Sequence, residues 1–296
     1  MDRDVIDVCL RLNGMSEEEI DSAFARLRST AAGSATHELI EAEVMKISAL
    51  SPVWTIRSGV GGGRFYRVRK HDADDLPQNL GALGYIRDAR KAGLGRANRK
   101  CSPVMYLAGQ AMTAMFETRL LPGQHFTLTQ YEMQESKLTL NLMHLGLQGM
   151  DSSNLSLKDA AVTPAAFALA GLNATGFENI RRVQSRLGDI FTNPDERIYP
   201  VSSELAQVYY RTDFTDGLLY PSMRHDGVLN FAILPRAADA KLVATQAWGF
   251  VALDVSDGPE IKDRYVTFQH LRTAPLLGAK AIGWADASAS NRPHWI

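Results

Sequence analysis

Apolar residues in the first fifty positions recur at helical spacing. Two sets of them predict one helix each: Ile20, Phe24 and Leu27, then Ile40, Val44 and Ile47. Ser16 and Glu19 have the spacing of a capping box, in which each side chain accepts a hydrogen bond from the other residue's backbone N–H. Short helices are marginal on their own, so we expect residues 1–50 to pack against the rest of the chain or against a partner.

Beyond a glycine-rich segment at residues 58–63, apolar and polar residues alternate in the manner typical of β-strands. The strands that this pattern predicts cover residues 64–69, 104–108, 125–133, 137–143, 217–220, 228–234 and 265–269. The expected helices cover 110–121, much of 155–190 with a start at Pro164 and a break at Gly176, and a segment up to Arg211 capped by Ser202 or Ser203. Strands and helices do not alternate strictly, so we expect an α+β fold rather than a doubly wound sheet.

The change of pattern at the glycine cluster sets the expected domain boundary. We predict a helical N-terminal extension at residues 1–57 and a second domain at residues 58–296. Glycines before a strand can also hold phosphate, but the Lys-Ser/Thr pair of a P-loop does not follow them. A hinge is therefore the preferred interpretation of this segment.

The composition is that of a globular protein. Hydrophobic residues make up 45% and charged residues 22% of the 296, which excludes wholesale disorder. Lys and Arg together number 32 against 33 Asp and Glu, so nucleic acid is not an expected partner. Two distant cysteines, Cys9 and Cys101, imply no disulfide framework. Since the sequence shows neither a signal peptide nor an apolar run long enough to span a bilayer, we expect a cytoplasmic protein without a membrane anchor.

Several common catalytic motifs are missing from the sequence. The segment Gly93–Asn98 begins like a dinucleotide-binding fingerprint, but Asn98 stands at the third glycine position and a strand follows instead of a helix. The seven histidines are widely spaced, without a His-x-x-x-His or Cys-x-x-Cys pattern, so we expect no metal site. There is also no Gly-x-Ser-x-Gly elbow to support a hydrolase triad.

Four short patterns occur in a fixed order along the chain. They are Phe65-Tyr66-Arg67-Val68, Gly95-Arg96-Ala97-Asn98, Val104-Met105-Tyr106-Leu107-Ala108 with Phe116-Glu117 after it, and the segment from Asp216 to Arg224 with Asn230 after it. In this order the chain resembles the RES domain family over about residues 64–235. Ala97 departs from the aromatic residue that is usual in the family, and the chain is longer than compact members. The resemblance implies an ADP-ribosyltransferase-like fold: a split, mostly antiparallel β core with helices around it, here the catalytic domain at 58–296.

Known members of this family consume NAD, and many are toxins paired with a separate antitoxin. The resemblance therefore implies NAD as the substrate, no metal, and a possible antitoxin or immunity protein on another chain. It implies that Glu117, Arg67 and Tyr106 are catalytic. It further implies that NAD is bound by these residues: Arg67, Arg96, Asn98, Tyr106, Ser222 and Arg224.

The residue types suit the chemistry of NAD. Arginine is a bidentate ligand for anions, so Arg67 and Arg96 are expected to hold the diphosphate. Cleavage of the nicotinamide–ribose bond leaves positive charge on the ribose, which the carboxylate of Glu117 would stabilise. Tyr106 would stack on nicotinamide or hydrogen-bond to it, and Ser222 would bind a phosphate or the nicotinamide amide. This interpretation requires Arg67, Arg96 and Glu117 to converge on one cleft.

Three functions stay open at this point. We prefer an NAD-degrading enzyme, either a glycohydrolase or a phosphorylase. A mono-ADP-ribosyltransferase that modifies a protein is the second choice, and a non-enzymatic binding module, docking through residues 1–50, is the third. The nucleophile is also open between water, phosphate and a protein side chain, because an oxocarbenium-like ion needs no dedicated base.

Overall fold

The computed structural model describes residues 3–32, 36–50, 55–58, 63–135, 138–146, 171–211, 215–225, 227–258, 263–279 and 281–293. The chain forms two compact units. The first contains Met1–Ser58, Asp88–Pro103 and Leu140–Pro221, and the second contains Gly59–Arg87, Val104–Thr139 and Ser222–Ile296. The expected division into domains at 1–57 and 58–296 stays a prediction.

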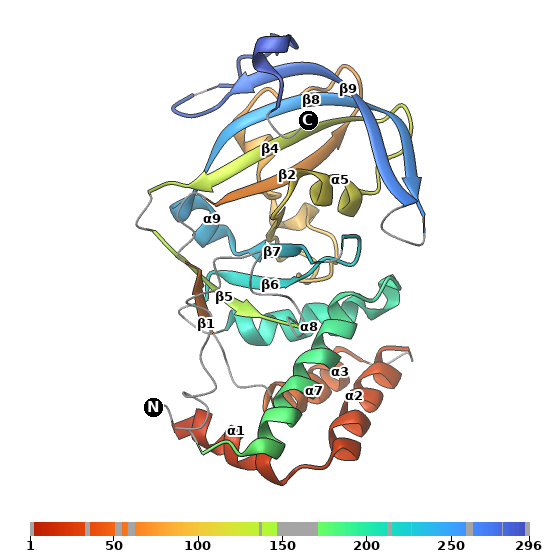
Figure 1. Cartoon of the computed structure of the whole chain (residues 1–296), viewed down its shortest axis with the longest axis vertical. Helices are drawn as coiled ribbons and strands as arrows, with labels where there is room; N and C mark the ends of the chain where they lie inside the picture. Colours follow the sequence, from red (N-terminus) through yellow and green to blue (C-terminus); the bar gives the residue numbers. More distant parts are fainter. Residues whose placement is uncertain are drawn as a thin grey trace. The chain divides into compact units, whose positions relative to one another are not determined.

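Helices make up most of the first unit (Figure 1). They are α1 (Arg3–Gly14), α2 (Glu17–Ala32), α3 (His37–Ser48), α7 (Ala174–Phe191) and α8 (Tyr199–Tyr210), with 3-10 turns η1 (Ala89–Lys91) and η3 (Glu196–Ile198). Helix α7 packs against α1 and α2, and α3 packs against α8. The apolar residues that predicted α2 and α3, such as Phe24 and Val44, are buried, so both predictions are confirmed.

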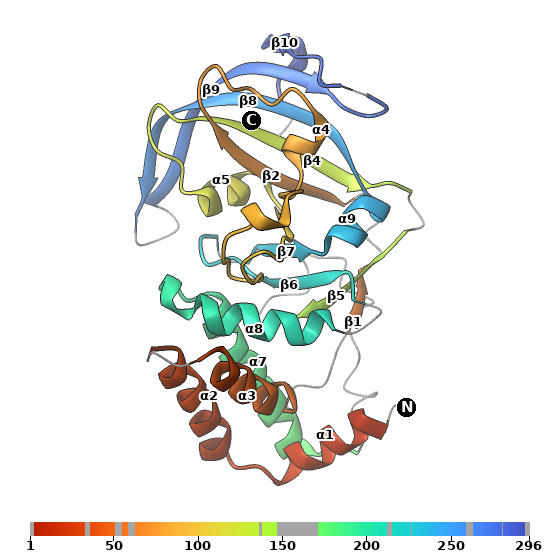
Figure 2. The same cartoon turned by 180° about the vertical axis from the view of Figure 1, so that it is seen from behind.

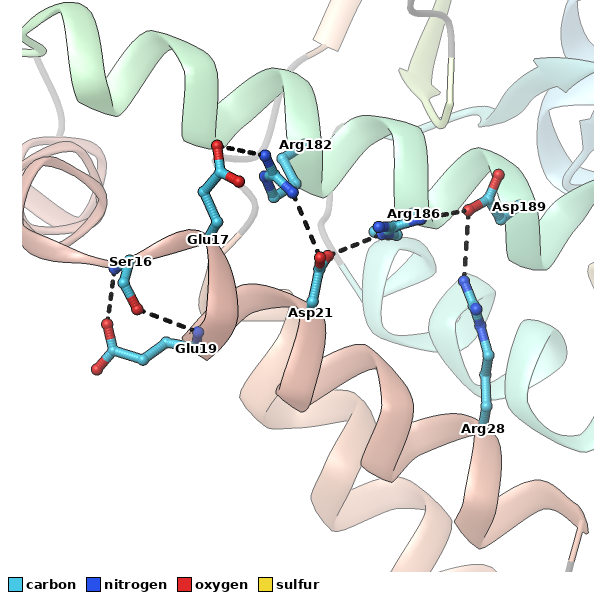
Figure 3. A network of polar contacts seen from close by, with 8 residues as sticks. All are labelled: Ser16, Glu17, Glu19, Asp21, Arg28, Arg182, Arg186 and Asp189. Carbon is cyan, nitrogen blue, oxygen red and sulfur yellow. Dashed lines mark hydrogen bonds and ion pairs between the residues drawn. The ribbon is translucent and has the colours of Figure 1, made fainter.

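Polar contacts fix the start of α2 and its position along α7 (Figure 3). Ser16 Oγ accepts from the backbone N of Glu19 at 3.2 Å, and Glu19 Oε2 accepts from the backbone N of Ser16 at 2.7 Å, which confirms the predicted capping box. Asp21 of α2 accepts from Arg186 at 2.9 Å and from Arg182 at 3.3 Å, both on α7. These ion pairs are partly exposed, and each contributes at most about 1 kcal/mol. Burial of the apolar faces therefore contributes most to holding these helices together.

Three strands complete the first unit: β1 (Thr55–Ser58), β5 (Leu140–His144) and β6 (Gly217–Pro221). Strand β5 pairs antiparallel with β1 and parallel with β6. Just after β5, Gly146 has a φ of 69° and lies against α7. A Cβ at this position would lie 2.2 Å from the Cα of Gly188, so the close approach requires glycine.

The second unit is built on a sheet whose described strands follow the order β7-β3-β2-β4-β8-β9-β10 (Figures 1 and 2). The strands are β2 (Arg64–His71), β3 (Met105–Ala108), β4 (His125–Met133), β7 (Leu229–Ile233), β8 (Leu242–Asp257), β9 (Arg264–Pro275) and β10 (Ala285–Asp286). Each neighbouring pair is antiparallel. The helical elements are α4 (Leu80–Leu83), α5 (Ala111–Thr118), α9 (Pro235–Lys241) and η5 (Ala289–Asn291). The predicted α+β class with a mostly antiparallel core is confirmed.

The two faces of strand β2 carry different kinds of side chain, and the strand pairs over different lengths with its two neighbours. Tyr66 and Val68 are buried against α5, so the alternation of a strand turns Arg67 and Arg69 to the opposite face. Strand β2 pairs with β4 along its whole length but with β3 at one position, Tyr66 opposite Ala108. Beyond this pair β2 and β3 are no longer joined, which agrees with the split core that the resemblance implies.

Two predicted helix boundaries are wrong. Gly176 does not break a helix but lies in the first turn of α7, where its backbone N donates to the Asn173 side chain at 2.9 Å. Ser202 and Ser203 are buried inside α8 and do not cap it. That helix begins earlier, at Tyr199, and Pro200 lies in its first turn. Proline is tolerated there because backbone N–H groups of the first turn have no acceptor within the helix.

Among the described elements that the sequence analysis did not predict, α1 and β8 are the longest. Helix α1 precedes the predicted helices, and β8 is a long strand that the alternation did not indicate. The pairing of β8 with β4 and β9 shifts register between Gln130 and Tyr131, between Gly249 and Phe250, and between Ala252 and Asp254. Each shift interrupts the two-residue period, which hides the strand in the sequence. The predicted helix start at Pro164 lies outside the described residues.

Candidate active site

Glu117 lies on α5, which follows β3 closely in the sequence. The helix ends at Thr118, and Arg119 takes a left-handed conformation with a φ of 49°. Thr113, Phe116 and Glu117 stand at positions i, i+3 and i+4, so they share one face of the helix. Residues on the opposite face are buried in the apolar core of the second unit: Ala111, Ala114 and Met115. The core therefore fixes which way Glu117 points.

The carboxylate of Glu117 is held through one of its two oxygens. Oε1 accepts hydrogen bonds from Ser222 Oγ and from Asn230 Nδ2, each at 2.7 Å. In the described part of the chain, Oε2 accepts no hydrogen bond and no Lys or Arg forms an ion pair with this side chain. Both donors are neutral. The arrangement therefore orients a carboxylate whose charge is not compensated by a described Lys or Arg and whose second oxygen accepts no hydrogen bond from the described residues.

Ser222 is itself fixed by the turn that follows it. Its Oγ accepts from the backbone N of Arg224 and of His225, each at 3.0 Å, and its own backbone N donates to the Val228 carbonyl at 2.9 Å. The single hydroxyl proton is donated to Glu117. Ser222 thus positions the carboxylate in this structure, and its expected contact with NAD stays a prediction.

A second set of contacts ties the same turn to α5. Thr113 Oγ1 lies 2.7 Å from His225 Nδ1, and the ring of Phe116 meets the His225 ring edge-on with centroids 5.9 Å apart. The Arg224 guanidinium forms an ion pair with Asp257 of β8. The turn is therefore anchored at both sides, and a role for Arg224 in NAD binding stays a prediction.

Arg67 lies where the sheet splits. Its Nη1 donates to the carbonyl of Tyr106 at 2.7 Å and so links β2 to β3 at a point where the strands are unpaired. On β3, Ala108 follows Tyr106 by two residues and pairs with Asn230, the amide donor to Glu117. Arg67 thus joins β2 to β3, and β3 in turn pairs with the strand that carries Asn230. That Arg67, Tyr106 and Glu117 act in one site stays a prediction.

Arg96 and Asn98 belong to the first unit, where both make structural contacts. Arg96 is buried, donates to the carbonyls of Phe191 and of Asn193, the latter at 3.0 Å, and has its guanidinium carbon 5.2 Å from the centroid of the Tyr199 ring. Asn98 Nδ2 donates to two backbone carbonyls of its own loop, each at 2.8 Å. The expectation that both residues bind NAD stays a prediction.

Three residues around Glu117 had no assigned role in the sequence analysis. Asn230 stands in the last of the four patterns, but nothing in its sequence context indicates that it meets a helix residue far upstream. Thr113 has a usable signal, because it lies one helical turn before Phe116 and Glu117. His225 has none, since the fold of the turn alone brings it to α5.

Among the described residues, no group of three or more His, Cys, Asp or Glu side chains is placed to hold a metal ion. None of the helices in the described ranges combines the length and the apolar character that a membrane crossing requires.

Comparisons with known proteins identify the family. A family model for the RES domain matches residues 64–253, more than half of the chain, and the protein therefore belongs to the RES domain family. A chain in the crystal structure of the M. tuberculosis MbcT–MbcA toxin–antitoxin complex is similar at 17% identity, with 69% of this chain and 89% of that chain covered and a TM-score of 0.32. No match was found among curated proteins.

Proposed function

We propose that the protein is an NAD-degrading enzyme that cleaves the bond between nicotinamide and ribose, and that it acts as the toxin of a toxin–antitoxin pair. The observation that carries this proposal is the carboxylate of Glu117, with Oε1 held by Ser222 and Asn230 and Oε2 left to a ligand. Membership of the RES family supports NAD as the substrate.

The chemistry requires a fixed negative charge next to the ribose. When the bond between C1′ and the nicotinamide nitrogen breaks, both electrons leave with nicotinamide, which becomes neutral, and positive charge develops on the ribose. Oε2 of Glu117 would stabilise this charge and accept a hydrogen bond from a ribose hydroxyl. The leaving group needs no proton, so a lone carboxylate suffices on the protein side.

The neutral partners of Glu117 suit this role. A guanidinium in their place would offset the charge of the carboxylate, whereas a hydroxyl and an amide orient it and leave the charge intact. A water oxygen then bonds to C1′ and releases its proton to solvent, which gives ADP-ribose. With inorganic phosphate as the nucleophile, the product is an ADP-ribose phosphate ester.

Nicotinamide release from NAD by the purified full-length protein tests the proposal. The assay is run with and without inorganic phosphate, and product masses distinguish hydrolysis from phosphorolysis. Glu117→Gln keeps the size of the side chain and an acceptor for Ser222 and Asn230 but removes the charge. We expect it to lower kcat by about 10²–10³, the usual effect of losing one preorganised electrostatic group.

Glu178→Gln is the matched control, because Glu178 is exposed on α7 and forms an ion pair with Arg181 of the same helix. Its activity should equal that of the wild type. Absence of nicotinamide release by folded wild-type protein under both conditions would refute the proposal, and so would full activity of Glu117→Gln.

The toxin role is tested in cells. Expression of the wild type in bacteria should deplete cellular NAD and stop growth, while Glu117→Gln expressed at the same level should do neither. Normal growth in cells whose NAD is depleted would show that the protein is an NAD-degrading enzyme but not a toxin. An antitoxin on a separate chain stays a prediction of the family resemblance.

A further inference from the structure

One buried surface of the second unit is unusually polar. It lies on the face of β2 and β4 opposite to α5, where Arg67 pairs with Thr129 and Arg69 pairs with Thr127. Tyr131 of β4 lies on the same face. Thr127, Thr129 and Tyr131 are all buried, and both arginines are partly buried. Buried sheet faces are normally apolar, so this set of side chains calls for a physical reason.

The two arginines have hydrogen-bond donors to spare. Arg67 Nη1 donates to the Tyr106 carbonyl at 2.7 Å, and Arg69 Nη2 donates to the Gly84 carbonyl at 2.5 Å. The Nε atoms of both are buried and have no hydrogen-bond partner in the described protein. Thr129 Oγ1, on the residue directly opposite Arg67, is buried and unpartnered in the same way.

The charges of the two arginines are also uncompensated. Within the described residues neither guanidinium forms an ion pair with a carboxylate. Burial, together with the neighbouring charge of Arg69, lowers the pKa of the Arg67 guanidinium to about 10. Burial raises the pKa of Tyr131 to about 12, so this phenol stays neutral and supplies no counter-charge. Holding two like charges together in this way is costly unless an anion joins them.

A phosphate group has the matching chemistry. It carries negative charge and several acceptor oxygens, and a guanidinium binds it through parallel N–H donors. Two arginines on alternate residues of one strand, with a hydroxyl opposite the first, place several N–H and O–H donors on one face of the sheet for such a group. Each arginine keeps part of its side chain exposed, although its Nε atom is buried.

We propose that Arg67, Arg69 and Thr129 form a binding site for a phosphate group. This assignment rests on the proposed function in one respect, namely that the phosphate belongs to the diphosphate of NAD. In this proposal the second arginine of the phosphate site is Arg69, which lies on the same strand face as Arg67. It is not Arg96, whose guanidinium donates to carbonyls of the first unit.

Titration of the full-length protein with ADP-ribose and, separately, with inorganic phosphate tests the site without requiring turnover. We expect Arg69→Gln to weaken ADP-ribose binding about 10- to 100-fold, the loss that follows when a charge-assisted contact is removed. Thr129→Val should weaken it by a smaller factor, and Arg69→Lys should restore part of it. In steady-state assays, Arg69→Gln should raise KM for NAD more than it lowers kcat.

Arg64→Gln is the matched control. Arg64 is on the same strand but on the other face, and it is exposed and 3.7 Å from Glu132. It should bind ADP-ribose as the wild type does. Circular dichroism and the melting temperature establish that each variant is folded.

The outcomes separate this inference from the proposed function. If folded Arg69→Gln binds ADP-ribose and inorganic phosphate as tightly as the wild type, the site does not exist. If it loses phosphate binding alone, the site takes free phosphate and the assignment to the diphosphate is overturned. If the wild type binds ADP-ribose through Arg69 but never releases nicotinamide from NAD, the proposed function fails and the site stands.

Discussion

Two glutamates, Glu204 in the first unit and Glu117 in the second, are both held firmly but by different partners. Glu204 is 4% exposed and forms a two-pronged ion pair with Arg99, and His37 lies 3.3 Å from one of its oxygens. Both oxygens are used and the charge is neutralised. Glu117 receives hydrogen bonds from neutral groups on one oxygen and keeps its charge. The contacts of Glu204 serve the fold, whereas Glu117 keeps the charge and the unused oxygen that the proposed function requires.

The positively charged arginines show the same contrast between a neutralised charge and an uncompensated one. Arg99 has Glu204 as its counter-ion, while Arg67 and Arg69 have backbone carbonyls and unpartnered Nε atoms. His144 of β5 shows the third outcome for a buried group without partners. Neither of its ring nitrogens has a hydrogen-bond partner among the described residues, and burial lowers its pKa to about 3, so the side chain stays neutral. A histidine can give up its charge in this way, but an arginine cannot.

The largest expected effect concerns Glu204. Glu204→Ala removes the nearest counter-ion of Arg99 and the buried member of the pair, and we expect the free energy of unfolding to fall by about 3 kcal/mol. Urea denaturation measures this change. Glu41→Ala is the control, because Glu41 is more exposed, lies 3.9 Å from Arg99 and forms its closer ion pair, at 2.6 Å, with Arg211. It should destabilise the protein clearly less than Glu204→Ala does. Equal costs for the two variants would contradict the contrast between the glutamates.

A smaller effect is expected at Ser222. Ser222→Ala removes one of the two donors to Glu117, so we expect kcat for NAD to fall about 10- to 100-fold with little change in KM. Steady-state kinetics of nicotinamide release provide the measurement, with Ser202→Ala, a buried serine of α8, as the control. A rise in KM with an unchanged kcat would show instead that Ser222 binds NAD directly, as the family resemblance implies.

The smallest effect is the pH dependence from His144. Because its pKa in the folded protein, about 3, is below the unfolded value near 6.5, the unfolded state binds more protons as the pH falls. Its stabilising contribution is complete above pH 6.5 and is lost progressively toward pH 3. Between pH 7 and pH 5.5 we expect a loss of about 1 kcal/mol in unfolding free energy. His144→Leu should flatten this dependence, and an unchanged slope in that variant would show that His144 is not responsible.

Parts of the fold with an uninterrupted period could be predicted from the sequence. The apolar residues of α2 and α3 and the alternation of β2 and β4 each repeat without a break, and these elements are found where they were expected. Strand β8 could not be predicted, because its register shifts destroy the period. The boundary of α8 was misplaced because serine is compatible with a cap and with a helix interior, and only packing decides between them.

The sequence by itself determined the family and the residues that carry the resemblance, Glu117 and Ser222 among them. Tertiary structure alone decided which oxygen of Glu117 is used and which arginines lack a counter-ion. The physical reason is that these properties depend on partners distant in the chain: Ser222 and Asn230 lie 105 and 113 residues from Glu117. The local period of apolar residues indicates which side of a helix or strand is buried. It does not indicate which buried side chains contact one another.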